Sequence, residues 1–412
     1  SSGTNVISAN LAGTGAGLTK SGAGTLTLSG ANTFGGGLIL SAGTLNLNSD
    51  TAPGSGTITI SGGTIDNTSG SGVTLSNNNT QSWNGDFTFT GTNTLNLGTG
   101  AVSLGASCTV TVSGGTLGVG GIISGSGYSL TKAGAGMLTL RGANTYTGGT
   151  TLSAGTLNIN NASAIGSGSF TISGGTLNNT SGSSVTLSTN NAQTWNGDFA
   201  FTGTNDLNLG NGAVTLGASR TVTVNGGILT VGGIISGSSL GLTKAGAGTL
   251  ILGGANTYTG ATTVSGGTLQ TSAADRMSDS SAISVSSGAT FALGGNETVA
   301  SISGAGNYSL GANTLTFGDT SNQTVSGTIS GTGALVKSGS GSITLSSSNS
   351  YSGGTTISVG TIRIGHDNAL GSGSLKLGVS GTTATITFSS TDATDRSISN
   401  VLTAFVGSSW NT

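Results

Sequence analysis

Residues 134–157 read GAGMLTLRGANTYTGGTTLSAGTL, and this segment contains the features that decide the fold. Leu138 and Leu140 flank Thr139, an alternation with a period of two that is typical of a strand with one buried face. Gly148-Gly149 supplies a corner, because glycine reaches positive φ without strain. The segment therefore predicts short strands separated by tight corners, with no helical periodicity.

The segment belongs to a long internal repeat. Leu-Thr-Lys occurs at residues 18–20, 130–132 and 242–244, at equal steps, and a fourth start, Leu335-Val336-Lys337, follows after a shorter step. Between the first two repeats the register holds without a gap, so that Trp83 falls on Trp195. We expect one continuous domain over residues 1–412, with repeat units at about 18–129, 130–241, 242–334 and 335–412.

The repetition selects one architecture among the all-β classes. A sandwich or barrel closes on itself, whereas a solenoid stacks units that contact only their neighbours and can be extended by duplication. The sequence therefore predicts an all-β chain folded as a right-handed parallel β-helix, an elongated rod. With turns of roughly 20–25 residues, each full repeat holds about five turns and the chain about eighteen.

Composition excludes several functions. The chain has 79 Gly and one Pro, and only 5% of its residues are charged, with 10 Lys and Arg against 12 Asp and Glu. Ten bases cannot form the basic footprint of a nucleic-acid-binding protein. No run approaches the ~18–20 apolar residues of a membrane-spanning helix. Low charge suits a solenoid, because like charges stacked in neighbouring turns repel.

Candidate reactive groups are few. Cys108 is the single cysteine, which excludes an internal disulfide and a Cys-rich metal site, and its alignment with Arg220 predicts a corner near solvent. Glu297 is the single glutamate. Two acid–arginine groups, at residues 275–279 and 392–396, are interpreted as surface ion pairs. With one histidine, His366, no relay can be assembled. We predict no catalytic residue, no cofactor and no metal.

The repeated segment resembles a known family. Residues 134–157, with further copies at 22–45, 246–269 and 339–362, are similar to the autotransporter-associated β-strand repeat of bacterial surface proteins. The resemblance implies a passenger region of type V secretion, a right-handed parallel β-helix that is extracellular, at the bacterial cell surface and associated with the outer membrane. It also implies a family that contains adhesins, proteases and plain stalks.

Two kinds of side chain recur at the same place in each repeat, and each allows two interpretations. The lysines are either solvated corner residues or a row of cations for anionic glycans, and the aromatic residues either stack on sugars or cover the edge of a turn. The candidate glycan or surface contacts are Tyr146, Tyr258, Tyr351, Lys132 and Lys244. Thr88, Thr90, Thr92 and Thr94 suggest ice binding as a further option, although Gly and Asn interrupt the alternation.

The function predicted is a structural, non-catalytic stalk or fibre-forming subunit. We expect either that the chain is one stretch of a longer rod or that copies join end to end, because an open sheet edge is a template for further pairing. The alternative is an adhesin passenger that binds glycans or a host receptor through its lateral face. A polysaccharide-active enzyme is a third hypothesis, which requires clustered carboxylates.

Overall fold

The computed structural model describes residues 3–378, 384–388 and 397–404, and every regular element within these ranges is a β-strand. Neighbouring strands pair in parallel and form a β-solenoid of about 18 turns, which confirms the predicted fold class and turn count. Within the described ranges no helix is long and apolar enough to cross a membrane. The chain divides into two units, Ser1–Gly212 and Ala213–Thr412. The single continuous domain stays a prediction.

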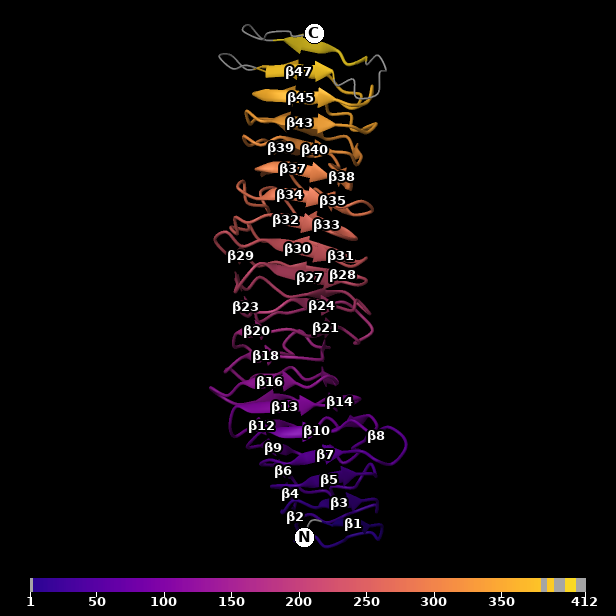
Figure 1. Ribbon diagram of the computed structural model, residues 1–412. Helices are drawn as coiled ribbons and strands as arrows, with labels where there is room; N and C mark the ends of the chain where they lie inside the picture. The colour runs from indigo at the N-terminus through magenta and orange to yellow at the C-terminus, as the bar shows by residue number, and fades with distance from the viewer. Residues whose placement is uncertain (1–2, 379–383, 389–396, 405–412) are drawn as a thin grey trace. The chain divides into compact units, whose positions relative to one another are not determined.

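In the first unit, successive turns place their strands one above another, as the indigo-to-magenta part of Figure 1 shows. The strand pairing defines three main stacks. The first stack contains β1 (Thr4–Ile7), β3 (Thr25–Leu28), β5 (Thr44–Leu47), β7 (Thr64–Asp66), β10 (Phe87–Phe89), β13 (Cys108–Val112), β16 (Leu130–Ala133), β18 (Thr150–Leu152), β20 (Phe170–Ile172) and β23 (Gln193–Trp195). The second contains β2 (Leu18–Lys20), β4 (Leu38–Leu40), β6 (Ile58–Ile60), β9 (Gln81–Trp83), β12 (Val102–Leu104) and β15 (Ile123–Ser124). The third contains β8 (Val73–Thr74), β11 (Leu95–Asn96), β14 (Thr116–Val119), β17 (Met137–Leu140), β19 (Thr156–Ile159), β21 (Thr176–Asn178) and β24 (Phe199–Phe201), and β22 (Val185–Thr186) pairs with β25 (Leu207–Asn208).

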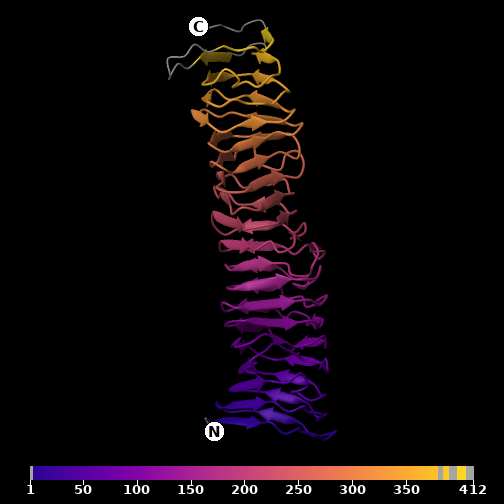
Figure 2. The same cartoon turned by 90° about the vertical axis from the view of Figure 1, so that its right-hand side faces the viewer.

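The second unit is built in the same way (Figure 2). One stack contains β27 (Arg220–Val224), β30 (Leu242–Ala245), β32 (Thr262–Val264), β34 (Ala282–Val285), β37 (Ser301–Gly304), β40 (Gln323–Val325), β43 (Ser342–Leu345), β45 (Gly360–Ile364) and β47 (Ala384–Phe388). Another contains β28 (Ile228–Val231), β31 (Thr249–Leu252), β33 (Thr268–Thr271), β35 (Thr290–Ala292), β38 (Asn307–Ser309) and β41 (Ile329–Ser330). A third contains β36 (Glu297–Val299), β39 (Thr314–Phe317), β42 (Ala334–Lys337), β44 (Thr355–Ile357), β46 (Leu375–Leu377) and β48 (Leu402–Ala404), and β26 (Val214–Leu216) pairs with β29 (Ile235–Ser236).

The core of each unit is a column of apolar side chains inside the turns. In the first unit Leu45, Ile65, Phe89 and Val112 are register partners in successive turns, and each is at most 2% exposed. The alternate residues, such as Thr64, point outward. The period of two thus separates an apolar interior from a polar surface, while the ladders between turns satisfy the main-chain amides.

The sequence repeat and the solenoid turn are out of phase. Strands β3 and β17 begin at equivalent positions of the first two repeats, Thr25 and Met137, yet they lie in different stacks. Five turns lead from β3 through β5, β7, β10 and β13 to β16, and β17 is the next strand of the following face. One repeat therefore spans about five and one-third turns. Equivalent residues of consecutive repeats face different directions.

Candidate functional site

The recurring aromatic and lysine side chains point into the solenoid. Each of the five candidate contact residues is 0% exposed, namely Tyr146, Tyr258, Tyr351, Lys132 and Lys244. Phe34, Lys20 and Lys337, at the equivalent places of the other copies, are at most 6% exposed. The expectation of solvated corner lysines is therefore wrong, and the arrangement gives no support to glycan contact through these side chains.

The lysines also form no row. In the first unit Lys20 lies in β2 and Lys132 in β16, and these strands belong to different stacks because of the third-of-a-turn offset. Lys244 in β30 and Lys337 in β42 are separated in the same way within the second unit. Burial lowers the pKa of Lys132 and of Lys244 to about 8, so both side chains remain mainly cationic at neutral pH.

Each motif tyrosine is fixed by a threonine four residues later. The Tyr146 hydroxyl lies 2.5 Å from Thr150 Oγ1, and Thr150 donates to the carbonyl of Ile165 in the next turn at 2.8 Å. Equivalent pairs join Tyr258 with Thr262 and Tyr351 with Thr355. Burial raises the pKa of all three tyrosines well above the usual range. The tyrosines are packing residues with a satisfied hydroxyl.

The motif asparagine, which sequence reasoning missed, replaces part of a strand ladder. Asn144 lies where the turn has no strand; its Oδ1 accepts from Ile123 N of the preceding turn at 2.8 Å, and its Nδ2 donates to Ala164 O of the following turn at 2.5 Å. Asn32, Asn256 and Asn349 make the same two bonds. One buried amide thereby joins three turns. Its recurrence in every copy was the available signal.

Two other recurring or aligned positions are also internal. Trp83 donates from Nε1 to Gln81 Oε1 at 3.1 Å and packs edge-on against Phe87, with ring centroids 5.0 Å apart, so it is a packing residue. Cys108 was expected near solvent but is 2% exposed, and burial raises its pKa to about 11. The alignment of Cys108 with Arg220 led to the wrong prediction, because the long side chain of Arg220 can extend its charge to the solvent from an equivalent position.

The single glutamate is buried in the second unit. Glu297 is 1% exposed, and its carboxylate accepts from Arg276 N at 2.9 Å and Met277 N at 3.1 Å. Desolvation raises its pKa. The predicted ion pair at residues 275–279 is not formed through Arg276 Nε, which is buried without a hydrogen-bond partner. The second group, at residues 392–396, lies outside the described residues.

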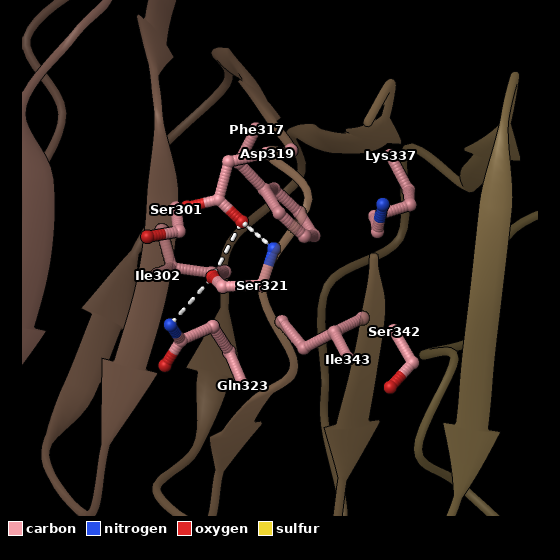
Figure 3. Close-up of a pocket in the computed structure, with 10 residues that line it drawn as sticks. Ser301, Ile302, Phe317, Asp319, Ser321, Gln323, Lys337, Ser342 and Ile343 are labelled. Carbon is pink, nitrogen blue, oxygen red and sulfur yellow. Dashed lines mark hydrogen bonds between the residues drawn. The ribbon is translucent and has the colours of Figure 1, made fainter. Parts of the chain in front are cut away.

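Figure 3 shows a small surface crevice in the second unit. Asp319 accepts from the Ser321 amide and hydroxyl, and Ser321 in turn accepts from the Gln323 amide at 2.9 Å. Lys337 lies on the opposite wall. The free space is about 10 Å³, enough for about one water molecule. It is too small for a sugar.

The described part of the chain also bears on two further kinds of site: a metal site, which the sequence does not predict, and the ice-binding option. No group of three or more His, Cys, Asp or Glu residues is placed there to hold a metal ion. The segment suggested for ice binding leaves β10 after Phe89, and the Thr92 hydroxyl is engaged by Asp66 at 2.6 Å. A flat rank along residues 88–94 is therefore not formed.

The comparisons with known proteins agree with this geometry. The passenger-associated-transport-repeat matches residues 18–47, 130–159, 242–271 and 335–364, which contain the lysine, asparagine and tyrosine positions described above. The chain is similar to this repeat in four separate segments. The resemblance to autotransporter-associated repeats is thus confirmed.

One curated relative extends the match. The "Adhesin BmaC autotransporter" of Brucella suis biovar 1 (strain 1330) is 35% identical over 189 residues, which cover 44% of this chain and 5% of the relative. The aligned segment is therefore a small part of that protein. No solved structure matches the chain. The repeats and this relative together indicate an autotransporter-type passenger β-helix that is secreted to the cell surface.

Proposed function

We propose that the chain is a structural, non-catalytic segment of an extracellular stalk or fibre, associated with the bacterial outer membrane. The observation that carries the proposal is the inward direction of the recurring motif side chains: Lys132, Asn144 and Tyr146 all bond to groups inside the solenoid. A motif selected for ligand contact would direct at least one of these groups outward. Here the repeat is used to hold turns together.

The surface chemistry supports the same function. In the described part of the first unit, Arg141 is the basic residue that faces solvent, whereas Lys20 and Lys132 are buried. A surface with so few accessible cations offers few cleavage sites to trypsin-like proteases. It suits a long-lived material outside the cell.

Joining of copies end to end is part of the proposal. Each inner turn pairs through its main chain with the turns on both sides, whereas β1 and β2 have a paired strand on one side only among the described strands, so a second copy can supply the same ladder there. Electron microscopy of the purified chain over a range of concentrations tests this. Particles that lengthen with concentration are expected; particles of one fixed length at every concentration would refute end-to-end joining.

The adhesin alternative is favoured by the matched relative and by one exposed aromatic residue. Tyr128 lies outside the motif, is 38% exposed, and was missed because Leu240 stands at the equivalent position of the next repeat. Exposed tyrosines can stack on sugars. Binding to glycan arrays or host cells that is lost in Tyr128→Ala but kept in Tyr146→Phe would favour an adhesin over a plain stalk.

A further inference from the structure

After three of the four motif lysines, the corner gathers main-chain carbonyl oxygens around a single point inside the solenoid. In the second copy, Lys132 Nζ donates to Ala133 O at 2.9 Å, Gly134 O at 2.7 Å and Ala154 O at 3.0 Å. The first two oxygens belong to its own turn, and the third belongs to the next turn. We call this group of three oxygens the carbonyl cage.

The cage recurs in two further copies. Lys244 Nζ donates to Ala245 O, Gly246 O and Gly266 O at 2.9, 2.9 and 3.1 Å. Lys20 Nζ donates to Ser21 O, Gly22 O and Ala42 O at 3.4, 2.7 and 2.9 Å. In all three copies the oxygens come from the same two stacked corners, at one, two and twenty-two residues after the lysine.

Glycine accounts for the inward direction of the carbonyls. Gly134 and Gly155, at the two stacked corners, have φ of +77° and +67°, a left-handed conformation that reverses the peptide relative to a strand. A Cβ at Gly43, the equivalent of Gly155 in the first copy, would overlap Lys20 Nζ itself. The lysine ammonium group therefore occupies the space that a side chain at this glycine would need.

The cage is matched to a cation with N–H donors. No carboxylate accounts for the electrostatics of Lys132 or Lys244, whose pKa is governed by burial, so the balancing partial charges come from carbonyl dipoles. Three oxygens pair with the three N–H bonds of an ammonium group, whereas a neutral amine has only two. An empty cage would leave buried carbonyls without a donor, at a cost of about 1–3 kcal/mol each.

We propose that the carbonyl cage is a binding site for a compact ammonium-type cation, which the chain fills with its own lysine. When the side chain is shortened, the cage takes ammonium or methylammonium from solution. The site exists because two turns are stacked, so its cation joins one turn to the next. The motif lysine thus links two neighbouring turns by hydrogen bonds.

The fourth copy provides an internal comparison. Val359 stands where the second copy has Ala154, and among the described carbonyls Lys337 Nζ donates to Gly339 O alone, with the Asp319 charge acting on it from the preceding turn. This incomplete cage should bind a free cation less well than the other three.

The test is thermal unfolding of Lys132→Ala and Lys244→Ala in ammonium or methylammonium chloride against tetramethylammonium chloride, which has the same charge and no N–H. Each variant is expected to melt at least about 2 °C higher in the first two salts, with a midpoint that rises with their concentration. Lys337→Ala should respond less, and the exposed Lys376→Ala and the unaltered chain should not respond. Equal midpoints in all three salts would overturn the proposal.

A second measurement needs no substitution, in case a variant does not fold. In protein labelled with ¹⁵N-lysine, the ammonium protons of Lys132 and Lys244 should exchange slowly with water, whereas those of Lys376 exchange at once. Equally fast exchange at all three lysines would mean that the cages do not hold the cation.

Discussion

Motif turns and intervening turns of the first unit differ in length and in how they are held. Met137 pairs with Thr156 of the next turn, whereas Thr64 pairs with Thr88, so the motif turn is the shorter of the two. The short turn is bonded to its neighbours by buried side chains. The extra residues of the longer turn form loops such as the one at Asn67. The side-chain Nδ2 of Asn67 donates to Ser71 O and Thr94 O.

This difference assigns separate tasks to the two kinds of turn. The motif fixes the length and stacking of a turn and directs its recurring lysine, asparagine and tyrosine side chains inward. The intervening turns carry the loops and the exposed Tyr128. Variation in surface contacts is therefore expected between motif copies.

The largest expected effect comes from adding one methyl group at a motif corner. Gly155 and Gly182 both have positive φ, +67° and +93°, but a Cβ at Gly155 would overlap carbonyls of the preceding turn, while one at Gly182 meets nothing within 4 Å. Gly155→Ala should abolish cooperative folding of the first unit. Gly182→Ala should cost only the backbone strain of about 1–2 kcal/mol. Denaturant midpoints measure both, and equal losses would show that φ alone matters.

The next effect separates a buried bridge from an exposed one. Asn144→Ala leaves Ile123 N and Ala164 O without partners, at about 1–3 kcal/mol for each buried group. Asn160 bonds to Thr180 of the next turn in a similar way, but at the surface, where water can replace it. Asn160→Ala should therefore cost less than about 1 kcal/mol. Similar losses in both variants would contradict the distinction between motif and intervening turns.

The third prediction concerns the dependence of stability on pH. In an intervening turn a carboxyl group, that of Glu297, accepts main-chain N–H hydrogen bonds, whereas in the motif a side-chain amide accepts them. Glu297 caps Arg276 N and Met277 N, and burial raises its pKa. Between the ordinary and the raised pKa the folded chain keeps a proton that the unfolded chain has lost. The free energy of unfolding should fall as pH rises through this window, by about 1.4 kcal/mol for each pH unit that the window spans.

Urea unfolding at pH 4 and pH 8 provides the check. The chain should be more stable relative to Glu297→Gln at pH 4 than at pH 8. A difference between the chain and Glu297→Gln that does not vary with pH would mean that folding leaves the pKa of this carboxyl group unchanged.

The sequence predicts the fold better than the direction of the motif side chains. Alternation and the long internal repeat were enough for a parallel solenoid of about 18 turns. The alternation Leu130-Thr131-Lys132 also places Lys132 on the face of Leu130, so the inward lysine was predictable, but its charge argued for solvent. The compensating oxygen, Ala154 O, comes from the next turn.

Other features could not be obtained from the sequence. The bridge made by Asn144 depends on which residues of neighbouring turns lie opposite it, and this requires the length of every turn. The offset of a third of a turn depends on the same quantity, because the length of one repeat fits several whole or fractional numbers of turns. The number of residues in each turn cannot be read from the sequence, because the loops between the strands differ in length.

The smallest expected effect tests the division of tasks most directly. Tyr146→Phe removes a hydroxyl that contacts Thr150, while Thr150 keeps its bond to Ile165 O, so the cost should be about 1 kcal/mol. Tyr128→Phe, at an exposed position, should leave the melting temperature unchanged. Any binding to glycans or cells should respond in the opposite way, falling in Tyr128→Ala and not in Tyr146→Phe. A loss of binding in Tyr146→Phe at unchanged melting temperature would contradict this division, since it would make the motif itself a contact site. The Tyr146 side chain is 0% exposed, so such contact would require the turn to open.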